Sequence, residues 1–209
     1  MYKAQLADYR RQVVDLYAAV RKSTDPADAW ADWRKGRDEL FASHDQSPVP
    51  ADDRLSFGGS PFFEYDPAWR VLAEIDTIEE DVTLIDNSGG GTTGFIRFCV
   101  ARSAIHGEPF ALNLYWLDSY GGGVFLPFRD LTNLSTTYGE GRYLLDGAKG
   151  ADLGKEGDAL VLDFNFSYHP SCVWDDRWSC PLAPPGNSLP IEIRAGERLI
   201  PRDPTRRGA

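Results

Sequence analysis

Two stretches near the N-terminus carry apolar residues at the three- and four-residue spacing of an amphipathic helix. Over residues 3–22 these positions form one stripe, which consists of Leu6, Tyr9, Val13, Leu16, Tyr17 and Val20. Asp25 and Pro26 then fit the N-cap and first helical position of a second helix, which we expect to end near Ala42. The pattern predicts an N-terminal helical hairpin and linker over residues 1–54, acting as a brace on a main domain.

From Leu55 onward the spacing of apolar residues changes to two, as in half-buried strands. The clearest alternation lies in residues 69–75, 96–100, 110–116 and 160–166. Glycine-rich turn signals separate several of these segments, and no long helical pattern lies between them. The second region, residues 55–209, is therefore predicted to be mainly β, folded as an antiparallel β-sandwich or a barrel-like domain.

The glycine-rich segment Gly89–Gly94 matches the pattern G-x-G-x-x-G of dinucleotide-binding sites. That motif works by joining a strand to a helix whose N-terminus faces the phosphates. Here the segment leads directly into the predicted strand at residues 96–100, so we interpret it as a hairpin turn.

Charge and composition limit the classes of function. The chain has 209 residues and a formal net charge of -10, the opposite of the Lys and Arg surplus that nucleic-acid binding requires. The sequence shows no signal-like N-terminal run and no apolar stretch long enough for a membrane span. We expect a cytoplasmic protein with reduced thiols, no bound cofactor, and no nucleic-acid or membrane partner. The oligomeric state stays open.

Two arginines flank a short loop in the second half of the chain. Arg129 and Arg142 could converge on a carboxylate or phosphate, since guanidinium groups bind such anions through paired hydrogen bonds. They could equally pair with the chain's own Asp130, Glu140 or Asp163. The remaining candidate ligand-binding residues near this loop and in the following segment are Asp130, Tyr138, Asn165, Tyr168 and Asn187.

The segment 164–190 combines cysteine, histidine, prolines and aromatic residues. His169, Cys172 and Cys180 are three candidate zinc ligands, but seven residues separate the cysteines, where structural zinc sites usually place two to four, so we expect no metal. Cys172 could be a nucleophile with His169 as its base. A Cys172–Cys180 disulfide is also possible, although a reducing cytoplasm disfavours a permanent one. The remaining interpretation is a proline-stiffened loop that lies over one end of the β-domain and walls a pocket.

Several longer motifs carry a family resemblance. They occupy residues 33–40, 65–70, 128–132, 137–144, 163–172 and 180–190. In these motifs the chain resembles domain-of-unknown-function family 1684, over nearly its whole length. The resemblance implies a mainly β domain and no particular activity. The chain departs from the family pattern at His169, where the family more often carries Asn.

Three hypotheses on function follow from the residues. The first is binding of a small anionic molecule in a pocket of the β-domain, near Arg129, Arg142, Asn165 and Tyr168. It requires the arginine-bearing turn to meet the proline-stiffened segment in space. The second is a hydrolase or transferase that uses the His169, Cys172 and Cys180 region, with or without zinc. The third is a protein-interaction module that uses the N-terminal helices, which would need Trp30 or Trp33 to be exposed.

Overall fold

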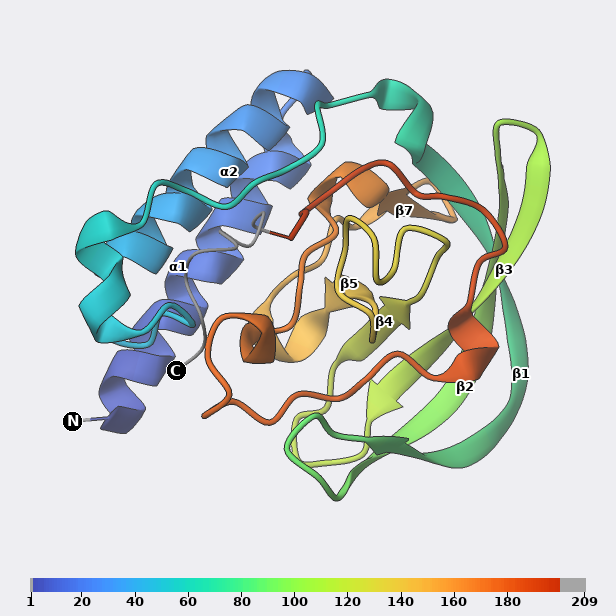
Figure 1. Cartoon of the computed structure of the whole chain (residues 1–209). Helices are drawn as coiled ribbons and strands as arrows, with labels where there is room; N and C mark the ends of the chain where they lie inside the picture. The colour runs from blue at the N-terminus through green and yellow to red at the C-terminus, as the bar shows by residue number, and fades with distance from the viewer. Residues whose placement is uncertain (1, 200–209) are drawn as a thin grey trace.

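The N-terminal helical hairpin is present as predicted. The computed structural model describes residues 2–199, beginning with helix α1 (Tyr2–Lys22) and helix α2 (Pro26–Ser43), which lie side by side along one side of the molecule (Figure 1). Asp25 is the N-cap of α2, and its side chain accepts hydrogen bonds from the backbone N–H groups of Ala27 and Asp28 at 2.9 and 3.0 Å. The cap satisfies amide groups that lack a partner within the helix.

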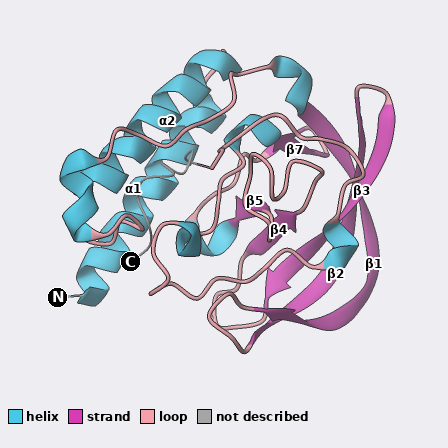
Figure 2. Cartoon of the chain, viewed as in Figure 1, coloured by secondary structure: helices cyan, strands magenta, loops and turns pink. Residues whose placement is uncertain are grey.

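Seven strands follow the hairpin and form one antiparallel sheet. They are β1 (Arg70–Asp86), β2 (Thr92–Ile105), β3 (Glu108–Leu117), β4 (Val124–Phe128), β5 (Arg142–Asp146), β6 (Lys155–Glu156) and β7 (Ala159–Asp163). Their order in the sheet is β5-β4-β3-β2-β1-β7-β6, and each neighbouring pair is antiparallel. The long strands β1, β2 and β3 curve around the side of the molecule opposite the helices (Figure 2).

The predicted sandwich or barrel is replaced by a single open sheet within residues 2–199. The C-terminal segment covers one face of that sheet in place of a second sheet. Its Leu189, Ile193 and Ala195 are buried in the same core as Leu112 on β3 and Phe128 on β4. Prolines and aromatic residues give this segment apolar area, although it does not pair as a strand. The spacing of apolar residues alone does not distinguish such a covering segment from a strand.

Strand β7 ends earlier than the alternation of residues 160–166 predicts. A single 3-10 turn spans Phe164–Phe166, and the Asp163 side chain accepts a hydrogen bond from the backbone N–H of Asn165 at 3.0 Å. This local cap turns the chain away from the sheet. The Gly89–Gly94 segment does join β1 to β2, so the interpretation as a hairpin turn is confirmed.

A second apolar cluster joins the hairpin to the rest of the molecule. Trp33 is 2% exposed and its ring lies 5.0 Å from that of Phe166, while the Trp30 indole N–H donates to the Asn165 carbonyl at 2.8 Å. Both tryptophans are buried, so neither offers a surface to a protein partner. The division into residues 1–54 and 55–209 stays a prediction, and its last ten residues lie outside the described part.

The helices of the described residues were compared with the length and apolar character of a membrane span. Neither α1 nor α2 combines the length and apolar character needed to cross a bilayer, and the same holds for every helix within residues 2–199.

Candidate functional site

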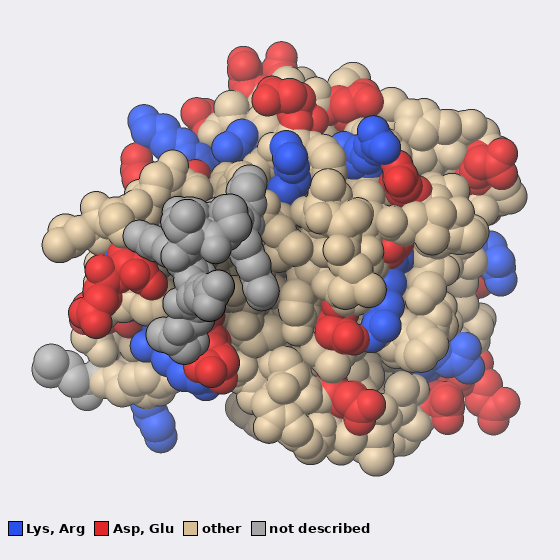
Figure 3. All heavy atoms as spheres, viewed as in Figure 1, with Lys and Arg blue, Asp and Glu red and all other residues tan. Residues whose placement is uncertain are grey.

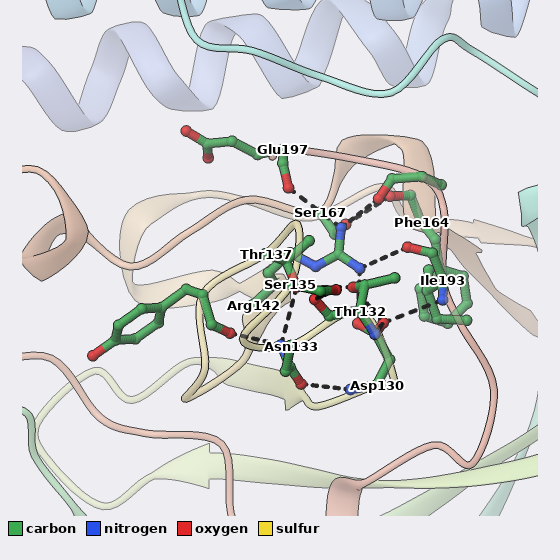
Figure 4. A network of polar contacts seen from close by, with 12 residues as sticks. Asp130, Thr132, Asn133, Ser135, Thr137, Arg142, Phe164, Ser167, Ile193 and Glu197 are labelled. Atoms are coloured by element: carbon green, nitrogen blue, oxygen red, sulfur yellow. Dashed lines mark hydrogen bonds and ion pairs between the residues drawn. The ribbon is translucent and has the colours of Figure 1, made fainter. Parts of the chain in front are cut away.

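Arg142 lies at the centre of a buried network rather than in an open site (Figure 4). Its side chain is 0% exposed, and one Nη donates to Asp130 Oδ2 at 2.8 Å and to the Ile193 carbonyl at 2.9 Å. The other Nη donates to the carbonyl of Ala195. Asp130 in turn accepts from the Ile193 N–H at 3.2 Å. These contacts tie the C-terminal segment to the arginine-bearing turn.

Arg129 points to different partners. Its guanidinium group pairs with Glu140 and donates through Nε to the Ala183 carbonyl at 2.9 Å. Its backbone N–H donates to the Asn187 carbonyl at 2.9 Å. The arginine-bearing turn therefore meets the proline-stiffened segment, as predicted. The two guanidinium groups, however, each pair with the chain's own carboxylate, and they do not converge on one anion.

The two candidate asparagines also serve as backbone partners. Asn187 Nδ2 donates to the carbonyls of Asn113 and Pro127 at 2.9 and 2.8 Å, and its Oδ1 accepts from the Asn113 N–H. Asn165 Nδ2 donates to the carbonyl of Asp66 at 2.9 Å. Both side chains are 0% exposed and satisfy backbone groups that the loops would otherwise leave unpaired.

A cavity of about 290 Å³ lies between the helical hairpin and residues 168–181. Its apolar wall comes mainly from both helices and consists of Leu6, Tyr9, Val13, Leu16, Tyr17, Trp33, Leu40 and Phe41. Tyr168, His169 and Cys180, three of the predicted site residues, form part of the opposite wall. The volume is close to the lower end of the range typical of small-molecule pockets.

The charged residues that line this cavity are all basic. They are Arg10, Arg37 and Lys149, and no Asp or Glu is among its described lining residues. On the molecular face in Figure 3, by contrast, acidic and basic side chains are interspersed. Arg37 pairs with Glu197 at 2.8 Å, and Lys149 pairs with Asp146 at 3.2 Å. Burial opposes the charge of Lys149, but Asp146 together with other nearby groups outweighs this effect, so the pKa of Lys149 is raised.

His169 presents a neutral imidazole to the cavity. Burial, together with the positive charges of Arg142 and Arg37, holds the pKa of His169 well below its usual range. Its Nε2 accepts a hydrogen bond from the Tyr138 backbone N–H at 3.1 Å. The single proton of the neutral ring is therefore on Nδ1, which makes Nδ1 a hydrogen-bond donor. With Nε2 occupied by a backbone group, the ring is not positioned as a base for Cys172.

Cys180 lines this cavity, whereas Cys172 lies earlier in the same segment and is partly buried. Hydrogen bonds from the Cys180 thiol, and then from the Ser88 and Tyr138 hydroxyls, lower the pKa of Cys172 to about 6 in spite of its partial burial. Within residues 2–199 no group of three or more His, Cys, Asp and Glu side chains is arranged to hold a metal ion. The three predicted zinc ligands, His169, Cys172 and Cys180, are therefore not assembled as a metal site in the described part of the chain.

The family model described as "Protein of unknown function (DUF1684)" matches residues 55–198. The chain belongs to the DUF1684 family. Its fold is also similar to the solution NMR structure of an uncharacterized protein from gene locus rrnAC0354 of Haloarcula marismortui. The two chains are 32% identical, the TM-score is 0.58, and the match covers 81% of this chain and 91% of the other. A search of curated proteins gave no match.

The family match begins at residue 55, after the two helices that form much of the cavity wall. Sequence reasoning missed Arg37 and Lys149 as cavity residues. Arg37 follows Trp33 by four positions on α2, so its place on the apolar face was a usable signal. Lys149 lies in a short turn after β5, and no local pattern indicates that it faces α1.

Proposed function

We propose that this protein binds a small amphipathic carboxylate in the cavity between the helical hairpin and residues 168–181. One observation carries the proposal: the cavity has an apolar and aromatic wall, and the charged residues that line it within residues 2–199 are all basic. We place the proposed anion site near Arg10, Lys149 and His169 in this cavity, in place of the predicted site near Arg129 and Arg142.

In this proposal the two sides of the cavity have complementary roles. The aliphatic and aromatic side chains of α1 and α2 would bury the apolar part of the ligand. Arg10 and Lys149 would attract the carboxylate, and His169 Nδ1–H would donate a hydrogen bond to it. A pocket of mainly apolar lining with a few polar groups that fix orientation is typical of small-molecule sites.

The hydrolase or transferase hypothesis receives less support from the same geometry. It assigned the base to His169, and the structure directs the Nε2 of that residue to the Tyr138 backbone.

The three unpaired cysteines, Cys99, Cys172 and Cys180, agree with the cytoplasmic location that we propose for the protein.

Thermal shift with matched ligands tests the proposal. Octanoate should raise Tm by several degrees, while octanol at the same concentration should raise it less, because the tighter of two ligands stabilises the folded state more. Equal shifts for the acid and the alcohol would contradict an anion site.

Two variants of neighbouring arginines supply the control. Arg10→Gln removes a charge from the cavity lining, and Arg11→Gln removes the same charge from the adjacent position, which does not line the cavity. We expect Arg10→Gln to weaken octanoate binding about threefold to fivefold, as is typical of a partly exposed charge contact, and Arg11→Gln to leave it unchanged. Equal effects of the two variants would indicate only long-range attraction.

A further inference from the structure

A second pocket, of about 150 Å³, is lined by residues from the end of α1, the start of α2 and the strands β1, β6 and β7. Within residues 2–199 it shares no lining residue with the cavity described above. One water molecule needs about 10–15 Å³ of such space, so the pocket has room for a small organic molecule. Its apolar lining consists of Val20, Pro26, Leu153, Val161 and Phe166.

Asp163, the last residue of β7, contributes a buried carboxylate to this pocket. The residue is 1% exposed, and its Oδ1 accepts hydrogen bonds from the backbone N–H and Nδ2 of Asn165 at 3.0 and 2.8 Å. Within residues 2–199 no group donates to Oδ2, and no cation forms an ion pair with the carboxylate. A carboxylate buried in this way is costly when it is charged, and a ligand that supplies a cationic donor would offset that cost.

The basic residues of the pocket leave the Asp163 carboxylate unpaired. Arg70 lies directly opposite Asp163 in the pairing of β1 with β7, so the two side chains share one face of the sheet. Arg70 nevertheless forms its ion pair with Glu156, which also lines the pocket. Arg21 and Lys155 are exposed lining residues, and neither pairs with a carboxylate within residues 2–199. The pocket therefore has an unpaired anion inside and two unpaired cations near solvent.

We propose that this pocket binds a small zwitterion of the α-amino acid class. The ammonium group donates to Oδ2 of Asp163, and the carboxylate lies against Arg21 and Lys155. A simple cation would leave the two basic residues without a partner, and a simple anion would leave Asp163 without one. The apolar lining accommodates a short side chain, such as the methyl group of alanine. This proposal does not depend on the ligand proposed for the larger cavity.

Three ligands of similar size test the two charge contacts separately. L-Alanine carries both charges, lactate has a hydroxyl in place of the ammonium group, and ethylamine lacks the carboxylate. In titration calorimetry of the full chain at neutral pH, alanine should bind at least about tenfold more tightly than either analogue, because each analogue loses a charged hydrogen-bond partner. Absence of alanine binding, or equal affinity for alanine and either analogue, would overturn the proposal.

The contact with Asp163 is tested by Asp163→Asn, which keeps an oxygen that can accept from Asn165 and removes the charge. We expect alanine to bind at least about tenfold more weakly to this variant, while octanoate binding to the larger cavity stays unchanged. Asp158→Asn is the matched control, because Asp158 is exposed and does not line the pocket, and it should leave alanine binding unchanged. Equal alanine affinity of the two variants would contradict the proposal.

A surface variant tests the carboxylate contact without changing a buried residue. Arg21→Gln should weaken alanine binding about threefold to fivefold and leave ethylamine binding unchanged, since ethylamine has no carboxylate. Lys22→Gln removes the same charge at the next position, which is exposed and does not line the pocket, and should change neither. Alanine affinity that is unchanged in Arg21→Gln, or reduced equally in Lys22→Gln, would overturn the assigned orientation.

Discussion

Arg37 on α2 forms an ion pair with Glu197, which lies 160 residues later in the chain, and the two side chains are 8% and 0% exposed. The pair links the helical hairpin to the C-terminal segment at the cavity. The same Glu197 oxygen also accepts a hydrogen bond from the His169 backbone N–H at 2.8 Å. This contact extends the link to the wall of the cavity that lies opposite the helices. The cavity is therefore bounded by elements that are tied to each other through one carboxylate.

Removal of Arg37 should destabilise the fold strongly. In Arg37→Met the Glu197 carboxylate stays buried without its cationic partner, so we expect a loss of about 3–5 kcal/mol in the free energy of unfolding. Urea denaturation measures this value. The matched control is Arg102→Met, since Arg102 pairs with Asp76 while both are more than half exposed, and it should cost less than about 1 kcal/mol. Similar losses in the two variants would contradict the structural role of the buried pair.

Trp33 should hold the hairpin to the β-domain. Its ring contacts Phe166 and, at 5.8 Å between ring centres, Phe62. Trp33→Ala should therefore cost about 3–5 kcal/mol through lost contacts and the cavity that remains. Calorimetry or urea denaturation measures the loss. Leu55→Ala, at a side chain that is 101% exposed, should change stability by less than about 0.5 kcal/mol. If Trp33→Ala were as mild as this control, the hairpin would not be a brace.

Gly141 should tolerate no side chain. Its φ is +97°, and a Cβ atom there would lie 2.4 Å from the Phe128 carbonyl oxygen and 2.7 Å from Ala183 Cβ. Gly141→Ala combines backbone strain with these contacts, so we expect a loss of more than about 2 kcal/mol. Gly107→Ala separates the two effects, because φ is +86° there and nothing lies within 4 Å of the added atom. It should cost about 1 kcal/mol from strain alone. Thermal denaturation of both variants checks the difference.

Because of Asp163, the free energy of unfolding should decrease as the pH rises from about 4 to 6. Burial raises its pKa from 3.8 to about 6, and the hydrogen bonds from Asn165 only partly offset this effect. Between these values the unfolded chain has released the proton while the folded protein retains it, so stability decreases with pH from about 4 to 6. The full effect at neutral pH is about 3 kcal/mol.

The variant Asp163→Asn tests this dependence. Asn retains an oxygen that can accept from Asn165 and carries no charge, so the variant should gain stability at pH 7 and lose the decrease between pH 4 and 6. Asp158→Asn, at an exposed position between β6 and β7, serves as the control and should follow the unmodified protein. A variant that is less stable than the unmodified protein at pH 7 would show that the carboxylate is needed in its charged form.

Local sequence patterns predicted the elements whose signals are complete within one segment. The Asp25 cap and the apolar stripe of α1 gave both helices to within two residues at each end, and the alternation at residues 96–100 and 110–116 identified the centres of β2 and β3. Strands β4 and β5 were missed, because Val124–Phe128 and Arg142–Asp146 are mostly buried and lack alternation. Whether the strands form an open sheet or a sandwich depends on which part of the chain covers the sheet. No single segment of the sequence contains that information.

The candidate site was less predictable for a related reason. Arg129 and Arg142 bear the residue type that binds anions, but their partners Glu140 and Asp130 are fixed only when the fold is complete. The cavity is formed by α1, α2, Lys149 and residues 168–181, which are adjacent only in three dimensions. Tyr168, His169 and Cys180, which line the cavity, were candidates because the segment that carries them combines proline, aromatic and reactive side chains.

Isotope-filtered NMR with uniformly ¹³C-labelled octanoate tests the central proposal most directly. We expect intermolecular NOEs from the alkyl chain to the rings of Trp33 and Tyr168 and to the Leu16 methyl groups, all of which line the cavity. These NOEs should disappear in Leu6→Trp, which adds a bulky ring at a residue that lines the cavity, and persist in Val14→Trp, where the side chain does not line it. NOEs confined to residues outside the cavity, or none at saturating octanoate, would contradict the proposed binding site.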